Sequence, residues 1–466
     1  MAEPTHSPYN FVPLPETGPD RERYPGLDRI GKDSYSGVLT CELEVLTRLF
    51  TADHQRAQPA TGERGDRRKI FPFLRSGETP ILQATSLKGM IRAVYEAAFP
   101  SCLPLAAAAG VSKQRGQDVF YSLTLPAPHR HESCNDPNKL CPACRLFGIA
   151  QGDEVHAQGR VIFSDAILAG DGLETGEVKL AELSSPKPHH YPIYSQTGAV
   201  GGTIRGRKFY YHHDPDQQPV VAELGPRSNA ISELAPRGRR FRFKIRLENL
   251  SGDEVKQLIS CLILDDEHAH KLGMAKPLGY GSCRIRICEE ESFIERGGER
   301  YRNWQRDKAS FSLSNWEIPT GWLTGSLGEL LRRDRPEAGP TGYLPLNSYR
   351  NKGIDPHGRY VTRSPMPAAA PSSEPPQTSQ KSQAGAFAGI LHQAEQPKSQ
   401  DLAKRKRATL EVIKDEAGQY TLRDPETGQD DIKFRGTGVP WRVGDRVKVR
   451  ISETTRDGRI KKIQPG

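Results

Sequence analysis

The sequence predicts an α+β protein with a ferredoxin-like (RRM-like) core, a zinc-binding insertion, a long linker and a small C-terminal β-barrel of the OB or SH3-like kind. Three observations support this fold class. Runs of alternating apolar and polar residues mark the core strands, two amphipathic helices separate them, and five short strand-like runs recur near the C-terminus. The order of the core elements fits two βαβ-type halves around one antiparallel sheet.

The first half of this core begins with a long strand at 36–51, where apolar and polar residues alternate. The clearest helix of the protein follows at 85–98, and its apolar residues fall on one face. Thr85 or Ser86 is expected to cap this helix, because a hydroxyl accepts a hydrogen bond from the free amides of the first turn. A further strand-like run covers 159–168.

The second half repeats the pattern of strand, helix and strand. An alternating strand is predicted at 241–247. The helix at 249–264 starts with Ser251 and has Glu254 three residues later, which is a capping box. A glycine-rich turn then leads into the last core strand, and the two together cover 272–288. These elements complete the predicted sheet.

The chain divides by composition into parts of different character. The segment 364–400 is rich in Pro, Ser, Gln and Ala and carries few charges, so it cannot bury a core and is predicted to be disordered. The last 60 residues or so contain short strands separated by turns, as a small barrel does. The predicted parts are an extended N-terminal arm (1–35), the core (36–300) with its zinc segment (129–148) and basic insertion (184–240), a core extension (301–363), a disordered linker (364–404) and a small β-barrel (405–466).

The charge balance favours an anionic partner. Lys and Arg number 66 against 57 Asp and Glu, which gives 66 − 57 = +9, and the pI is about 9.0. The mean hydropathy is −0.64 and no apolar run is long enough to span a membrane, so no membrane partner is expected. Eight cysteines are too few for a disulfide scaffold, and no signal segment follows the first Met. These features predict a cytoplasmic protein.

A cysteine-rich segment at 129–148 predicts a structural zinc site. Cys141 and Cys144 form a CxxC turn, and Cys134 lies shortly before it. His131 is the expected fourth ligand, and His129 competes with it for that place. No carboxylate or open position is evident nearby, so the zinc is expected to stabilise the fold and not to catalyse a reaction.

Three segments predict contacts with RNA. A helix start with a hydroxyl, a glycine and basic residues suits a phosphate, a glycine-rich turn lets backbone approach a ligand closely, and basic residues interleaved with aromatic ones suit single-stranded RNA. The stretch 201–246 carries ten basic and four acidic residues, a local charge of 10 − 4 = +6. The candidates are Ser86, Lys88, Gly89 and Arg92 on the helix, Lys276, Gly279 and Gly281 in the turn, and Arg205, Arg207 and Lys208 beside Phe209, Tyr210 and Tyr211.

Five segments of the chain, in order, resemble the RAMP superfamily of CRISPR-associated proteins, in particular the backbone-type subunits of type III effector complexes. The residues 85–92, TSLKGMIR, are similar to the S-x-K-G-x-x-R helix start of that family. The other matching segments are 141–148, 159–165, 206–212 and 270–281. The resemblance covers about residues 36–290, and the C-terminal barrel lies outside it.

The resemblance implies a subunit that grips the guide RNA (crRNA) of an antiviral ribonucleoprotein, with target RNA and other effector subunits as its partners. Ser86, Lys88, Arg92 and the Lys276 turn would hold the guide backbone. In active relatives, an Asp after the first strand supports cleavage of the paired target with a divalent cation such as Mg²⁺. This loop holds Asp53 and Asp66, and Asp66 is preferred from its separation to Ser86, although the Gly and basic residues around it depart from the family pattern.

Three other functions remain open on the sequence alone. One is a catalytically silent scaffold subunit of the same kind of complex. Another is a stand-alone endoribonuclease that processes precursor guide RNA, with His190 or His212 as the acid or base. The last is a general zinc-stabilised RNA-binding protein without a CRISPR role.

Overall fold

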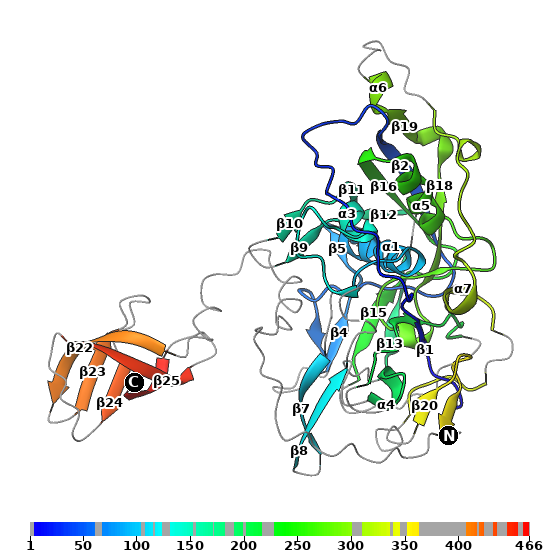
Figure 1. Cartoon of the computed structure of the whole chain (residues 1–466). Helices are drawn as coiled ribbons and strands as arrows, with labels where there is room; N and C mark the ends of the chain where they lie inside the picture. Colours follow the sequence, from blue (N-terminus) through cyan, green and yellow to red (C-terminus); the bar gives the residue numbers. More distant parts are fainter. Residues whose placement is uncertain are drawn as a thin grey trace. The chain divides into compact units, whose positions relative to one another are not determined.

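The structure is a computed structural model, and it describes two compact units, Met1–Pro375 and Pro376–Gly466. Figure 1 shows both units. The described residues are 4–60, 68–103, 108–114, 117–123, 131–151, 155–170, 172–181, 191–198, 202–216, 228–300, 310–335, 339–344, 352–362, 407–416, 419–423, 432–435, 445–454 and 460–465.

An antiparallel sheet with two helices forms the core of the first unit. The long strand β2 (Tyr35–Val45) lies between β16 (Arg240–Leu250) and β18 (Ser282–Ile287), and β12 (Ala166–Ala169) pairs with the far side of β16. The order β18-β2-β16-β12, with all neighbours antiparallel, is the ferredoxin-like order of two split βαβ units. The predicted α+β fold with its antiparallel sheet is confirmed.

One face of the sheet is covered by α1 (Ala84–Ala98) and α5 (Gly252–Leu262) (Figure 1). Along β16, Phe241, Phe243 and Ile245 are buried, whereas the basic residues between them are exposed. This period of two arises because successive strand side chains point to opposite faces. The Tyr95 hydroxyl donates to the Gln257 side-chain oxygen at 2.7 Å and joins the two helices.

The two helices begin differently. In α5 the predicted capping box is present, since Ser251 accepts from the Glu254 amide at 3.1 Å and Glu254 accepts from the Ser251 amide at 2.9 Å. The prediction that Thr85 or Ser86 caps α1 is wrong. The helix begins after Gln83, and the side chain of Asp165 accepts from the Ala84 amide at 2.7 Å. The cap therefore comes from a residue that is far away in the sequence.

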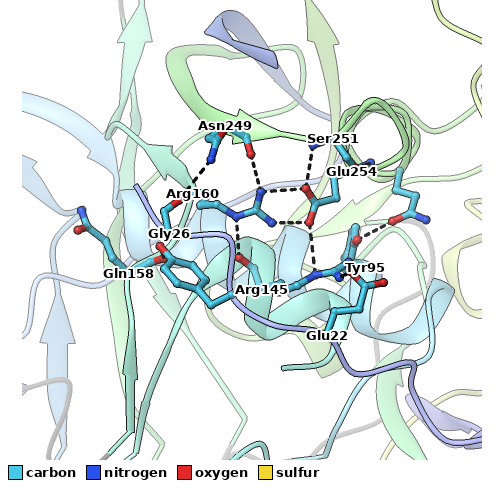
Figure 2. A network of polar contacts seen from close by, with 11 residues as sticks. Glu22, Gly26, Tyr95, Arg145, Gln158, Arg160, Asn249, Ser251 and Glu254 are labelled. Atoms are coloured by element: carbon cyan, nitrogen blue, oxygen red, sulfur yellow. Dashed lines mark hydrogen bonds and ion pairs between the residues drawn. The ribbon is translucent and has the colours of Figure 1, made fainter. Parts of the chain in front are cut away.

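A buried ion pair connects α5 to the segments around it (Figure 2). Arg160 is 1% exposed, and its guanidinium donates to both carboxylate oxygens of Glu254 and, at 2.8 Å, to the Asn249 carbonyl. It also donates to the Arg145 carbonyl at 3.1 Å. Arg145 in turn pairs with Glu22 of the N-terminal arm. Because every charge has a partner, this network can remain buried.

The N-terminal arm contains a strand. β1 (Tyr9–Val12) pairs with β14 (Arg207–Tyr210), so that Tyr9 lies opposite Tyr210. A second sheet has the order β13-β15-β4-β3. The remaining elements of the unit are β3 (Gln58–Pro59), β4 (Lys69–Phe71), β5 (Arg75–Ser76), β6 (Thr79–Leu82), β7 (Ala108–Gln114), β8 (Gln117–Leu123), α3 (Pro142–Phe147), β9 (Ile149–Gln151), β10 (Val155–Ala157), β11 (Val161–Phe163), β13 (Glu174–Lys179), α4 (Tyr191–Tyr194), β15 (Ala230–Leu234), β17 (His270–Lys271), η1 (Lys276–Leu278), η2 (Glu289–Glu291), β19 (Phe293–Arg296), α6 (Gly297–Arg300), η3 (Leu313–Asn315), α7 (Gly325–Leu331), β20 (Lys352–Ile354) and β21 (Tyr360–Thr362).

The second unit is a five-stranded antiparallel sheet with the order β24-β23-β22-β25-β26. Apolar side chains, among them Leu410, Val412 and Leu422, are buried in it. Five short strands were expected here, and five are present, whereas closure into a barrel stays a prediction. The strands are β22 (Arg407–Glu416), β23 (Gln419–Arg423), β24 (Ile432–Arg435), β25 (Arg446–Thr454) and β26 (Ile460–Pro465). Across the described residues of both units, no helix is long and apolar enough to cross a membrane.

Candidate metal centre and nucleic-acid interface

Four buried cysteines form the candidate metal centre. The sulfur atoms of Cys102, Cys134, Cys141 and Cys144 all lie within 4.8 Å of one another, and none is in a disulfide. The sulfur atoms of Cys102 and Cys144 are 3.6 Å apart. Zinc–sulfur bonds of about 2.3 Å in a tetrahedron place sulfurs about 3.8 Å apart, so this set fits a metal such as zinc. Such an ion would hold together three chain segments, around Cys102, Cys134 and the Cys141–Cys144 turn.

The fourth ligand differs from the one predicted. His131 is not part of the cluster, because its Nε2 lies 2.8 Å from the Pro15 carbonyl oxygen instead. Cys102 takes the fourth place, and it comes from the segment that follows α1, 32 residues before Cys134. Sequence reasoning missed it because an isolated cysteine carries no spacing signal. His129, the alternative ligand, lies outside the described residues.

Hydrogen bonds among the sulfurs lower the pKa of Cys134 and Cys141 and raise the pKa of Cys102 and Cys144, so they favour the thiolate at two of the four cysteines. The Cys141 amide donates to the Cys134 sulfur at 3.2 Å, and Arg21 donates to the same sulfur at 3.2 Å. Hydrogen bonds from Cys102, then Cys134 and Cys144, hold the pKa of Cys141 well below its usual range. Thiolates are the form that binds metal, and positive groups around them offset the negative charge of a four-cysteine site.

Two arginines predicted to bind RNA support this centre instead. Arg92 donates to Glu96 at 2.8 Å, to the Gly148 carbonyl at 2.9 Å and to the Cys144 sulfur at 3.6 Å. Arg207 donates to the other Glu96 oxygen and to the Cys102 carbonyl, both at 2.8 Å. Both guanidinium groups are therefore held inside the protein by the residues around the metal centre.

The rest of the predicted helix start remains near the surface. Ser86 and Lys88 are half-buried and Gly89 is exposed. Burial, followed by the charge of Arg92, lowers the pKa of Lys88. No described residue forms a hydrogen bond or ion pair with the Lys88 ammonium group, which lies close to Gly159, where an added Cβ would be 2.9 Å from it. Of the predicted helix residues, Ser86, Lys88 and Gly89 thus stay open to a ligand.

The glycines of the predicted turn make room for the protein itself. Gly279 and Gly281 have φ angles of +95° and +83°, which disfavour other residues. A Cβ on Gly281 would lie 1.9 Å from the Leu272 carbonyl oxygen, and one on Gly279 would lie 2.8 Å from the ring of His213. Lys276 is half-buried, and burial lowers its pKa. These contacts explain the glycines without an RNA ligand.

The basic and aromatic residues of the insertion pack against the N-terminal arm. The Lys208 ammonium lies 3.7 Å from the ring centre of Tyr9 and 5.1 Å from that of Tyr210, and burial lowers its pKa to about 8. The Arg205 guanidinium lies 5.3 Å from the ring centre of Phe11. These cation–π contacts are used within the fold.

The two candidate catalytic aspartates fare differently. Asp53 is 6% exposed, and one carboxylate oxygen accepts from the amides of Gln55 and Arg56 at 3.0 and 3.1 Å. Its other oxygen lies 3.7 Å from the Arg56 guanidinium. Asp53 therefore caps a turn. Asp66 lies outside the described residues.

A polar cavity of about 490 Å³ lies beside the glycine-rich turn, and we call it the arginine pocket. It is lined by 46–47, 212–214, Arg237, Ser282 and 333–335. His212 is 3% exposed, its Nδ1 lies 2.9 Å from the Ser282 hydroxyl, and burial holds its pKa well below the usual value. The arginines of this pocket were not singled out by the sequence. The other histidine candidate, His190, lies outside the described residues.

The first unit combines a ferredoxin-like sheet, a cysteine-rich insertion and a glycine-rich turn before the last strand of the sheet. The family model of the RAMP superfamily matches residues 42–284, which is more than half of the chain. The chain therefore belongs to the RAMP superfamily.

No curated protein matches the chain. Among solved structures, a chain described as "Type IV-B CRISPR Complex" is 16% identical, covers 58% of this chain and 95% of its own length, and gives a TM-score of 0.27.

Proposed function

We propose that this protein is the guide-RNA-binding subunit of a type III-like CRISPR ribonucleoprotein effector in antiviral defence. The observation that carries the proposal is the RAMP match over 42–284, which spans most of the ferredoxin-like sheet, both of its helices and the cysteine centre. The charge of +9 supports an RNA partner. Zinc at the four cysteines would fix the insertion against α1, and the other effector subunits and the target RNA would be further partners.

The surface that grips the guide is narrower in this proposal than the sequence suggests. Ser86, Lys88 and Gly89 at the start of α1 are open to a phosphate backbone. Lys276, which belongs to the glycine-rich turn, is half-buried. Arg92 and Arg207 are excluded from the grip because they hold Glu96 and the metal centre. Binding through the backbone would not read the guide sequence.

Cleavage of the paired target is a separable part of the proposal, and it rests on Asp66. Asp53 is already engaged by backbone amides and Arg56. We expect Asp66→Ala to abolish Mg²⁺-dependent target cleavage, while Asp53→Asn keeps cleavage in the folded fraction. If the wild type leaves the target uncut with and without the divalent cation, the protein is a catalytically silent scaffold.

A second function is favoured by the position of His212 in the arginine pocket. A neutral imidazole beside arginines could take a proton from a ribose hydroxyl in metal-independent RNA cleavage, although its lowered pKa makes it a weak base. An endoribonuclease of this kind should cut precursor guide RNA alone and in the presence of a chelator. Loss of that cleavage in His212→Asn, with the fold intact, would favour it over the guide-binding role.

The first test is to express the protein together with its neighbouring genes, purify it, and sequence the nucleic acid that stays bound. Short RNAs of uniform length that share one repeat-derived end would support the guide-binding role. Heterogeneous RNA, or none, would contradict it and leave a zinc-stabilised RNA-binding protein as the alternative.

A further inference from the structure

The arginine pocket contains three arginines that form no ion pair with a described carboxylate. Within the described part of the chain, no carboxylate forms an ion pair with Arg237, Arg333 or Arg335. Arg333 donates to the Asp266 carbonyl at 3.2 Å, and Arg335 donates to the His357 carbonyl at 2.7 Å and stacks on the Tyr211 ring. Neutral carbonyls position these guanidinium groups without cancelling their charge.

An unpartnered histidine lines the same pocket. His213 is only 8% exposed, and neither of its ring nitrogens has a hydrogen-bond partner among the described residues. A buried imidazole without a partner costs stability. Its position is fixed by Gly279, whose missing side chain leaves the space that the ring fills. A buried imidazole N–H without a hydrogen-bond partner, beside guanidinium groups without a carboxylate partner among the described residues, indicates a binding place for an oxygen-rich anion.

Two carboxylates narrow the identity of that anion. Asp214 and Asp334 also line the pocket, so three arginines stand against two aspartates, a net charge of 3 − 2 = +1. A bare phosphate would meet both attraction and repulsion here. A nucleotide also carries hydroxyl and amino groups that can donate hydrogen bonds to the carboxylates. The volume of about 490 Å³ falls in the range of ligand pockets.

We propose that the arginine pocket binds the phosphate group of a nucleotide, with Arg237, Arg333 and Arg335 as its positive contacts and Asp214 and Asp334 facing the sugar and base. This inference rests on the proposed function, because the nucleotide would belong to the RNA that the protein binds. A free nucleotide is the second source, and the two are distinguished below.

The test measures two ligands on the full chain with matched arginine variants. The binding of a fluorescein-labelled, 20-nucleotide single-stranded RNA is followed by fluorescence anisotropy, and the melting temperature is measured with and without millimolar AMP. Arg237→Ala with Arg333→Ala is the test variant, since Arg237 is exposed and its side chain forms no hydrogen bond or ion pair with the described residues. Arg332→Ala is the control, because Arg332 is adjacent but pairs with Glu267 outside the pocket.

We expect the double variant to bind the RNA about 10-fold more weakly or worse, with a shallower dependence on salt, while Arg332→Ala matches the wild type. Unchanged RNA binding together with an AMP-induced stabilisation that only the pocket variant loses would support a free nucleotide as the ligand. If neither response depends on the pocket arginines, the pocket proposal is wrong and guide binding is untouched. If the wild type binds no RNA, the proposed function fails, and the AMP measurement alone decides the pocket.

Discussion

The cysteine centre and the arginine pocket use the same residue type in opposite ways. Around the cysteines, Arg92 and Arg207 share the two oxygens of Glu96 and donate to carbonyls or sulfur. In the pocket, no described carboxylate forms an ion pair with an arginine, and Arg333 and Arg335 donate to neutral carbonyls. An arginine that resembles a family motif can thus be a structural cross-link, whereas one outside every motif can be available to a ligand. The state of its partners decides which.

The largest effect is expected at the cysteine centre. Cys141→Ser should remove the bound metal and lower the melting temperature by about 10 °C, because structural zinc contributes about 10–16 kcal/mol in small domains and even a fraction of that is large here. Metal content by mass spectrometry and thermal unfolding would measure this. The control is Cys288→Ser, which lies outside the cluster and should change neither quantity. Unchanged metal content in Cys141→Ser would refute the centre.

Arg207→Met tests whether this arginine belongs to the fold or to the RNA interface. The substitution leaves the Ser101 and Cys102 carbonyls without their donor and removes a buried ion pair, so it should cost about 3 kcal/mol of unfolding free energy. RNA affinity of the folded protein should stay the same. Denaturant unfolding and anisotropy titration together check this, and a weakened affinity without lost stability would return Arg207 to the interface.

Two glycines with positive φ compare a crowded position with an open one. Gly279→Ala should cost about 3 kcal/mol, since it adds the overlap with His213 to the backbone strain. Gly77→Ala, where nothing lies within 4 Å, should cost only about 1 kcal/mol from the strain. Equal losses of unfolding free energy in the two variants, measured with denaturant, would show that His213 can move to make room for the added methyl group.

The smallest effect at neutral pH comes from two buried histidines, His213 in the pocket lining and His270. Burial lowers the folded-state pKa of His270 to about 4, and that of His213, with smaller contributions from Lys271 and Arg335, to about 3. The unfolded chain therefore takes up protons first as the pH falls below 6.5, so stability is lost between pH 6.5 and 4, by about 1.4 kcal/mol per pH unit for each proton. In His270→Asn, the slope of the unfolding free energy against pH in this window should fall by the contribution of one proton. An unchanged slope would contradict the prediction.

Local patterns predicted much of this molecule, and long-range contacts account for the rest. The alternation in β16, the capping box of α5 and the CxxC turn are visible within a few residues of sequence, and all three are present. Cys102 as a ligand and Asp165 as the cap of α1 come from distant segments that no spacing connects. The arginine pocket joins five separate segments, so its composition follows only from the fold.

The pairing of the N-terminal arm also bears on how the chain is made. Tyr9 of β1 lies opposite Tyr210 of β14, about 200 residues later. At roughly 5–20 residues per second, a ribosome needs about 10–40 s to deliver that partner after the arm has emerged. Tyr9 and Phe11, both buried in the finished protein, stay uncovered during this interval. Strand β1 is therefore synthesised long before the strand that covers it, and chaperones that bind exposed aromatic segments could bind it during this interval.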